Sequence, residues 1–392
     1  MTTTTFDAPL FRGDKFEVVS IGSLLGFVAA AQVSMAAACI MLAITLACWG
    51  TMVAVHHERV HVPAMFWLLV AYGAATIVSA LASTNPTQSL IDCKQLVLFL
   101  IVPVVYRFAG GTRALTFATL IITVGAVSAV VGIAQYGVFH YDNLGKRPQG
   151  SLTHYMTYSG VLMLVLGAAA ARLLYRRSDR VWTALVMPTL IVALALTLTR
   201  SAWVGACAGI AVLLALKDRR LLALLPVVAA LFIIVAPARV TQRMYSIIDV
   251  NDPTNRDRVA MLRSGVQMVR DKPLTGVGPD MVKAVYAEYR DPMAVQPLNP
   301  HLHNVPMQIA AERGLPALAI WIAFIAVLTR DLYRRLRHGR HPSLAAAGLA
   351  AVTSMLVAGL FEYNFGDSEF LMLFLVLVTL PYAADRIEPD VV

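Results

Sequence analysis

The residues best suited to chemistry lie at one point of the chain, where a long polar segment ends and an apolar one begins. His301, His303 and Asn304 come first, and Gln308 and Glu312 follow at helical spacing. The positive end of a helix disfavours a protonated imidazole, so His303 is predicted to act as a general base. A histidine with a purely structural role is the alternative for His303. His301 lies off the helix face and is predicted to be a loop residue.

Three arginines elsewhere in the chain could bind phosphate, because a guanidinium group offers paired donors that match phosphate oxygens. Arg200 lies in a short turn between two apolar runs, where a charge is costly and is usually functional. An interfacial anchor, with Trp203 in an aromatic belt, is the alternative. Arg258 lies on an amphipathic segment and Arg147 in a turn rich in Gly and Pro. A solvated surface is the alternative for both.

Neither a metal site nor a cofactor is predicted. The four cysteines lie within or at the edges of apolar runs, and no Cys–His spacing of a metal site occurs. The acidic residues of the long polar segment are scattered. They include no carboxylate pair of the DxD type, which would hold a divalent cation on a sugar diphosphate. The sequence therefore favours chemistry without a metal ion.

The elements that must position these residues are predicted to be membrane helices. Apolar residues make up 58% of the 392 residues and charged residues 14%, and the mean hydropathy is +0.68. A soluble chain carries about a quarter charged residues. Runs long enough to cross a hydrocarbon core of about 30 Å recur along the chain, and only helices satisfy their backbone groups in lipid. About twelve spans are predicted in this all-α polytopic membrane protein. They lie near 17–32, 35–54, 64–82, 91–108, 114–136, 155–173, 181–199, 202–216, 221–236, 311–329, 343–361 and 369–385.

The positions of Lys and Arg predict the orientation, since these residues collect in cytoplasmic loops. They lie in alternate short loops, whereas the loops at 83–90 and 362–368 contain none. Both termini are therefore predicted to be cytoplasmic. The net charge of +9 is explained by this topology and does not indicate a nucleic-acid partner. Residues 1–236 are predicted to hold spans one to nine, and residues 311–392 the last three spans and a cytoplasmic C-terminus.

The intervening segment, residues 237–310, is predicted to be a periplasmic loop with two helices. Residues 255–270 carry apolar side chains along one helical stripe. Asp271–Pro273 ends this helix, and Gly276–Pro279 is typical of a turn. Asp280 is predicted to cap a second helix that runs to Tyr289.

Three motifs in this order resemble the O-antigen ligase / O-antigen polymerase superfamily of bacterial envelopes. The first is Thr199–Trp203, and the second is Arg258 followed by Met268–Gly278. The third is His303–Asn304 with Gln308 and Glu312–Gly314. Each motif alone is weak, but their order directly around one long outer loop is fairly specific. The resemblance covers residues 145–370 and is greatest to the lipid A–core O-antigen ligase. Leu262, where the family often has Trp, and Pro306 depart from the family pattern.

The resemblance implies a GT-C-like glycosyltransferase of the bacterial inner membrane with its active site on the periplasmic side. The donor would be a glycan on undecaprenyl pyrophosphate, and the acceptor a hydroxyl of lipid A–core. The implied partners include membrane lipids but no nucleic acid. Arg200, Arg258 and Arg147 would bind the pyrophosphate. His303 would take the acceptor proton, and a single displacement would invert the anomeric centre. Four further residues would support this site: Trp203, Asn304, Gln308 and Glu312.

Two other functions remain open. An O-antigen polymerase would extend the glycan on the same lipid carrier. A flippase or transporter for lipid-linked sugars would carry paired halves and charges at the membrane midplane. The compact chain with one large outer loop favours the ligase. We also expect Arg200, Arg258 and His303, although distant in sequence, to converge on one cavity at the outer membrane interface.

Overall fold

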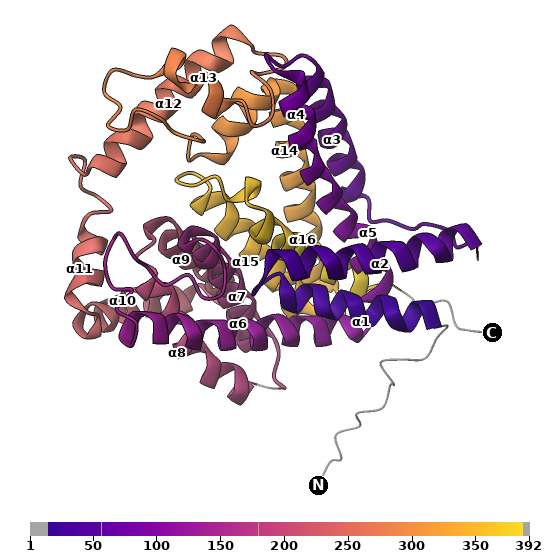
Figure 1. Cartoon of the computed structure of the whole chain (residues 1–392). Coiled ribbons are helices and arrows are strands. Elements are labelled where there is room, and N and C mark those ends of the chain that lie inside the picture. The colour runs from indigo at the N-terminus through magenta and orange to yellow at the C-terminus, as the bar shows by residue number, and fades with distance from the viewer. Residues whose placement is uncertain (1–14, 56, 179, 387–392) are drawn as a thin grey trace.

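A computed structural model describes residues 15–55, 57–178 and 180–386, and every regular element in these ranges is a helix (Figure 1). Six helical stretches are long and apolar enough to cross a membrane. They are α2 (Met35–Val55), α4–η1–α5 (Pro86–Phe108), α6 (Arg113–Gly137), α7 (Tyr155–Tyr175), α9 (Arg200–Lys217) and α14 (Val305–His338). Four shorter apolar helices accompany them: α3 (Met65–Leu81), α8 (Arg180–Leu196), α15 (Pro342–Ala358) and α16 (Ser368–Ala384).

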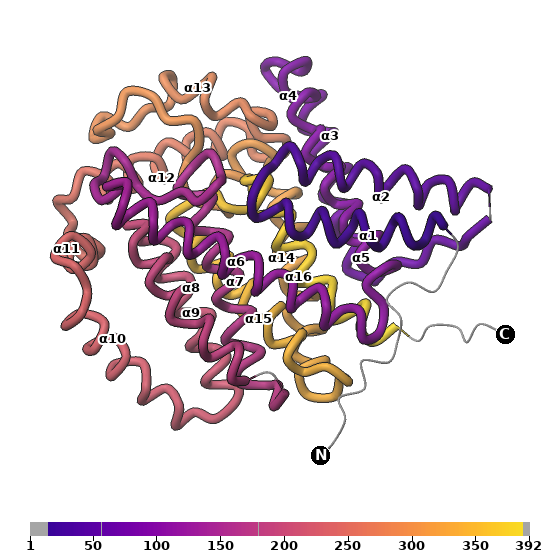
Figure 2. The backbone as a smooth tube through the Cα atoms, turned by 60° about the horizontal axis from the view of Figure 1, so that its bottom comes forward, coloured from indigo at the N-terminus to yellow at the C-terminus, as the bar shows by residue number. Residues whose placement is uncertain are grey.

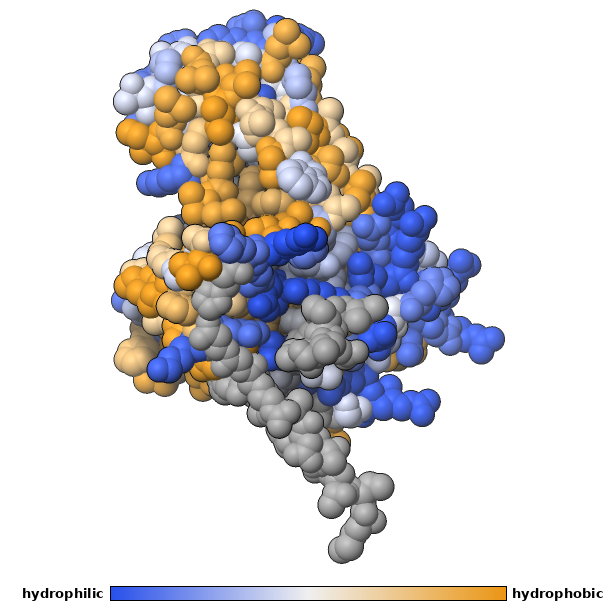
Figure 3. Space-filling view, turned by 90° about the vertical axis from the view of Figure 1, so that its right-hand side faces the viewer, coloured by the Kyte–Doolittle hydropathy of each residue, from blue (hydrophilic) through white to orange (hydrophobic). Residues whose placement is uncertain are grey.

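The predicted spans agree in position with these helices. The remaining two predicted spans fall on α1 (Lys15–Ala30) and on η2 (Arg219–Ala223) with α10 (Leu224–Val235). The all-helical class is therefore confirmed, while twelve crossings and a GT-C-like architecture stay predictions. Hydrophobic residues dominate the upper part of the face that carries α3 (Figure 3). Exposed Trp67 and Val78 on α3 suit contact with lipid.

The centre of the bundle is built from helices that are buried on nearly all sides. Almost every residue of α7 and α16 is buried, and α15 packs against α7, α9, α14 and α16. Small residues allow these helices to approach closely. A Cβ atom on Gly205 of α9 would lie 2.5 Å from the Met163 sulfur and 2.9 Å from Ala358. The bundle is thus a rigid base for the segments that carry the polar residues.

The segment between α10 and α14 contains three helices: α11 (Ala238–Tyr245), α12 (Pro253–Asp271) and α13 (Val282–Tyr289). The prediction of two helices here misses α11. Asp252 caps α12 by accepting from Thr254 N and Asn255 N. The predicted cap of α13 is wrong, because Asp280 has a φ of +60° and binds Lys283 and Gln88 instead. In Figures 1 and 2, α12 and α13 lie over one end of the bundle, and α10 and α11 run along its side.

A break in α14 frees backbone groups that bind this segment to the bundle. Gly314 has a φ of +78°, and a Cβ atom there would lie 2.2 Å from the Leu274 carbonyl oxygen. The break leaves the carbonyls of Ala311 and Glu312 free to accept from Val277 N at 2.8 Å and Gly278 N at 3.0 Å. Only glycine tolerates this conformation without strain. The turn at 273–278 therefore docks α12 and α13 on α14.

Candidate functional site

His303 and Glu362 form a hydrogen-bonded pair at the end of the bundle where α14 begins. Nδ1 of His303 lies 3.0 Å from a Glu362 carboxylate oxygen, although the two residues are 59 positions apart. The helix α14 starts only after His303, with Asn304 as its cap, and His303 itself has a φ of +48°. Its backbone therefore adopts a left-handed conformation that is uncommon outside glycine, which is typical of functional sites.

The charge of Glu362 decides the roles in this pair. Burial by itself raises the pKa of Glu362, but the charge and hydrogen bond of His303, together with His301 and Arg258, lower it to about 2. An ionised carboxylate can only accept, so Nδ1 of His303 donates and Nε2 is left without a proton in the neutral ring. The arrangement suits a histidine that acts as a general base through Nε2.

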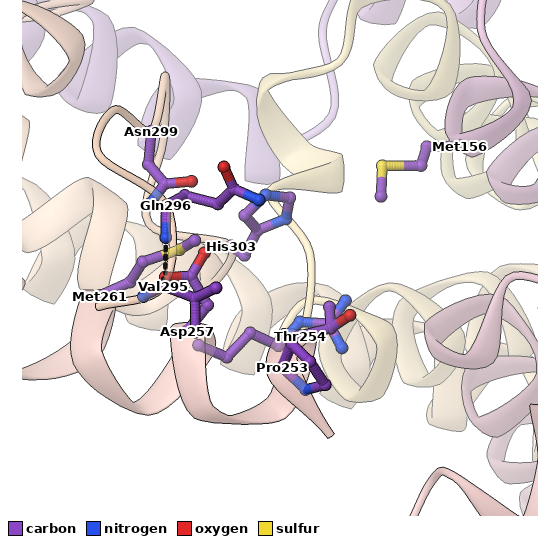
Figure 4. Close-up of a pocket in the computed structure, with 10 residues that line it drawn as sticks. Met156, Pro253, Thr254, Asp257, Met261, Val295, Gln296, Asn299 and His303 are labelled. Atoms are coloured by element: carbon purple, nitrogen blue, oxygen red, sulfur yellow. Dashed lines mark hydrogen bonds between the residues drawn. The ribbon is translucent and has the colours of Figure 1, made fainter. Parts of the chain in front are cut away.

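His303 and Arg258 line the same cavity, which has a volume of about 220 Å³. Figure 4 shows Pro253, Thr254 and Asp257 from α12 and His303 from the loop before α14, with Met156 of α7 across the space. Asp257 does not face a cation here: its Oδ1 accepts from Val295 N at 3.0 Å and Gln296 N at 3.2 Å. Arg258 is thus the cation of this cavity, and its buried Nε has no hydrogen-bond partner.

A cluster of arginines extends from this cavity toward α9 and α11. Nη2 of Arg200 lies 3.1 Å from Asp252 Oδ1, and Nη1 of Arg243 lies 3.7 Å from Asp252 Oδ2. Arg200 also donates to the Ser246 carbonyl at 2.6 Å. Arg147 donates to the carbonyl of Leu198 at 3.5 Å and stacks over Tyr155. Two arginines therefore bind one carboxylate, and the charges of Arg147 and Arg258 act on Arg243 beside them.

The four cations repel one another, which is why the cluster suits an anion. Burial, with the charges of Arg200, Arg147 and Arg258, lowers the pKa of Arg243 to about 10, while the charge of Asp252 opposes this shift. Burial and the charge of Arg200 likewise lower the pKa of Arg258, against the opposing charge of Glu362. A multivalent anion would relieve their repulsion.

The predicted convergence holds for two of the three residues. Arg258 and His303 share the cavity, but Arg200 lies behind it, bound to Asp252 and Ser246 and only 5% exposed. The interfacial-anchor alternative for Arg200 does not fit these contacts. Trp203 packs beside the core and donates Nε1 to the Leu194 carbonyl at 2.9 Å.

Asn304 and Gln308 hold the backbone around His303, and neither they nor Glu312 line the cavity. Asn304 accepts from Met307 N at 2.9 Å and donates to the Leu360 carbonyl at 3.1 Å. Gln308 accepts from Leu302 N at 2.6 Å. Glu312 is fully buried against Arg313 at 2.7 Å and lies among the contacts that dock the outer segment.

His301, His303 and Glu362 also form a group that could hold a metal ion. One ligand atom from each lies within 4.8 Å of the others, and the rings of His301 and His303 are 4.2 Å apart. Burial and the charge of His303 lower the pKa of His301 to about 4, so its ring is neutral at pH 7. Two imidazoles and a carboxylate are ligands that zinc accepts. The metal-free chemistry predicted above therefore needs an experimental test.

Sequence reasoning missed Arg243 and Glu362. Arg243 follows an ordinary amphipathic pattern, so only the position of α11 distinguishes it from a surface residue. Glu362 could have been identified as a candidate from its position in the sequence. It is an acidic residue at the end of an apolar helix, in one of the short loops without Lys or Arg. Charges at the edge of the membrane are usually functional.

The comparisons with known proteins bear on this site directly. A family model described as O-antigen ligase matches residues 184–322, which include Arg200, Arg243, Arg258 and His303. This part of the chain is therefore similar to O-antigen ligases, which supports the O-antigen ligase / O-antigen polymerase superfamily expected from the motifs. No curated protein matches the chain.

The family match bears on the type of reaction. It indicates an activity of the O-antigen ligase or polymerase type, that is, a glycosyltransferase-type enzyme of O-antigen processing. The apolar helices of the described residues agree with an integral membrane protein. Arg147 and Glu362, which complete the arginine cluster and the histidine pair, lie outside the matched range and join the site only through the fold.

Proposed function

We propose that the protein is an O-antigen ligase. It would transfer O-antigen polysaccharide from undecaprenyl pyrophosphate to a hydroxyl group of lipid A–core, with inversion and without a metal ion. The observation that carries the proposal is the cavity in which a candidate base, His303, and a phosphate-binding candidate, Arg258, meet. A transferase with a diphosphate leaving group needs both kinds of residue close together.

The reaction would proceed in one displacement. Nε2 of His303 takes the proton of the acceptor hydroxyl while the oxygen attacks the anomeric carbon. The bond from that carbon to the diphosphate oxygen breaks, and the leaving group departs as undecaprenyl pyrophosphate. Arg258, with Arg200, Arg243 and Arg147 behind it, would stabilise the charge that grows on the diphosphate. Glu362 would keep Nδ1 of His303 protonated and stabilise the positive imidazolium.

The topology is part of the same proposal. The site would lie on the periplasmic side of the inner membrane, with both termini in the cytoplasm. Residues 1–236 would hold nine spans, residues 237–310 the periplasmic loop and residues 311–392 the last three spans. Support comes from the absence of Lys and Arg at 83–90 and 362–368, on the side where the candidate site lies.

A polymerase is the second candidate, because it would use the same donor and the same chemistry with a different acceptor. A flippase is less well supported, since the candidate residues gather at one end of the bundle and not at its midplane.

Deletion of the gene in the native host tests the proposal. Loss of the lipopolysaccharide ladder with glycan accumulating on undecaprenyl pyrophosphate would support the ligase. Single repeats on the core would indicate the polymerase, and an unchanged ladder would contradict both.

A further inference from the structure

A second cavity, of about 270 Å³, lies beside the His303–Glu362 pair and has no role in the mechanism above. Met156 lines both cavities, and Glu362 and His301 form part of the wall of the second. The two cavities are therefore neighbours on either side of one short polar wall.

The chemistry of the second cavity differs from that of the arginine cluster. Neither Arg nor Lys is among the residues that line it. Its lining is polar but contains few charges: it includes His154, Thr157 and Asn364, with Phe370 as an aromatic surface. Asp367 also lines it, but Thr157 donates its hydroxyl hydrogen to this carboxylate. A phosphate would find no cation here, whereas a neutral group rich in hydroxyls would find donors and acceptors.

Two buried polar atoms of residues in this lining have no hydrogen-bond partner among the residues that the structure describes. They are Oδ1 of Asn364, a residue only 6% exposed, and Nδ1 of His301. Buried polar atoms in folded proteins are nearly always hydrogen-bonded, so unsatisfied atoms on two residues that line one cavity point to a ligand that supplies the missing bonds. A sugar hydroxyl can donate to one of these atoms and accept from or donate to the other.

The positions of the charged groups around His303 distinguish the binding site of the acceptor from that of the donor. In a displacement with inversion, the attacking hydroxyl approaches from the side opposite the leaving group. The diphosphate belongs with the arginines, and the second cavity lies beyond Glu362 and His301, on the cation-free side. We propose that this cavity is a carbohydrate subsite that holds a neutral sugar of the acceptor glycan, next to the sugar that is modified. The inference deepens the proposed function and rests on it, because the bound sugar belongs to an acceptor only if the protein is the proposed transferase.

Two substitutions remove the unsatisfied atoms with little change of shape. His301→Phe keeps a ring against His303 and Tyr363. Asn364→Ala removes Oδ1, and the Met355 carbonyl that Asn364 binds keeps its bond from Gly359 N. Each should raise the KM for lipid A–core roughly tenfold, the effect of about 1.4 kcal/mol of lost binding. For Asn364→Ala, the KM for the donor and kcat should change by less than about twofold. Ser354→Ala is the matched control, because Ser354 Oγ is also buried without a partner but lies away from the cavity.

A binding measurement separates this inference from the proposed function. Core oligosaccharide freed of lipid and phosphate is titrated against purified His303→Ala protein, in which transfer is not needed. Saturable binding that His301→Phe or Asn364→Ala weakens about tenfold supports the subsite even if no transfer is detected. Absence of binding, an unchanged acceptor KM in both variants, or a raised donor KM overturns it. Loss of transfer by the wild-type protein alone would count against the proposed function only.

Discussion

Oδ1 of Asp252 lies 3.1 Å from Nη2 of Arg200. A carboxylate is therefore already bound to the guanidinium group of the most buried arginine in the cluster. The same carboxylate lies 3.7 Å from Arg243 and caps α12, the helix that carries Arg258. A diphosphate that binds Arg200 must therefore compete with Asp252. Its arrival would shift the start of α12, which couples donor binding to the position of Arg258.

Asp252→Asn should tighten the binding of the diphosphate. The amide keeps the oxygen that caps α12 but loses the charge that competes for Arg200. We expect undecaprenyl pyrophosphate to bind the purified variant several-fold more tightly, as measured by titration calorimetry at fixed salt. Asp252→Ala is the control, because it also loses the cap and should cost about 1 kcal/mol of stability. Weaker binding to Asp252→Asn would contradict competition.

Lysine should replace Arg200 or Arg258 poorly. Lysine keeps the charge but loses the planar pair of donors that matches phosphate oxygens. We expect each Arg→Lys variant to lose about tenfold or more in kcat/KM, a loss of about 1.4 kcal/mol in transition-state stabilisation. Arg147→Ala should lose less, because its guanidinium is engaged with Tyr155 and backbone carbonyls. Full activity of both lysine variants would show that the contact is not to phosphate.

His303→Ala should abolish transfer while the protein still inserts and purifies as the wild type does. A general base contributes about 10²–10⁴-fold. His301→Ala should be milder, because His301 lies beside the base and lacks its carboxylate partner. Rates with purified donor and acceptor measure both. If His301→Ala proved the more damaging variant, the two histidines would have their roles exchanged.

Transfer should continue in EDTA and should need no added divalent cation, since four guanidinium groups can supply the positive charge that a metal supplies elsewhere. Metal analysis of the purified protein and rates after chelation test this expectation. A strict requirement for zinc or another divalent ion would locate the metal at His301, His303 and Glu362. The carboxylates of Asp252, Asp257 and Asp280 are already bound by arginine, backbone amides or Lys283.

Acid should destabilise the outer segment in a defined window. The folded-state pKa of His301 is lowered to about 4, below its ordinary value of about 6.5. The unfolded chain therefore binds the proton first, and stability falls as the pH drops from about 6.5 to about 4. His301→Phe should reduce the slope of Tm against pH in this range, followed by intrinsic fluorescence. An equal slope in the variant would show that His301 does not carry the effect.

Much of this protein follows from its sequence because lipid restricts the choices of the chain. An apolar run of about 20 residues can satisfy its backbone only as a helix. The predicted spans accordingly agree in position with helices of the bundle. The cost of a charge near lipid likewise singles out Arg200, and the turn chemistry predicts the end of α12 near Asp271.

Only the tertiary structure brings Arg243 and Glu362 into the site. Arg243 gains its role because α11 lies against Arg200 and Asp252, and nothing in its own amphipathic helix distinguishes it from a surface arginine. Glu362 meets His303 across 59 residues because α15 and α14 pack together, with Val305 N at the start of α14 bound to the Gly359 carbonyl at the end of α15. The strength of an electrostatic interaction depends on the distance between the two charges in space. The local periodicity of a sequence does not encode that distance. The same reason explains why Asp252, a cap by its sequence position, also neutralises Arg200.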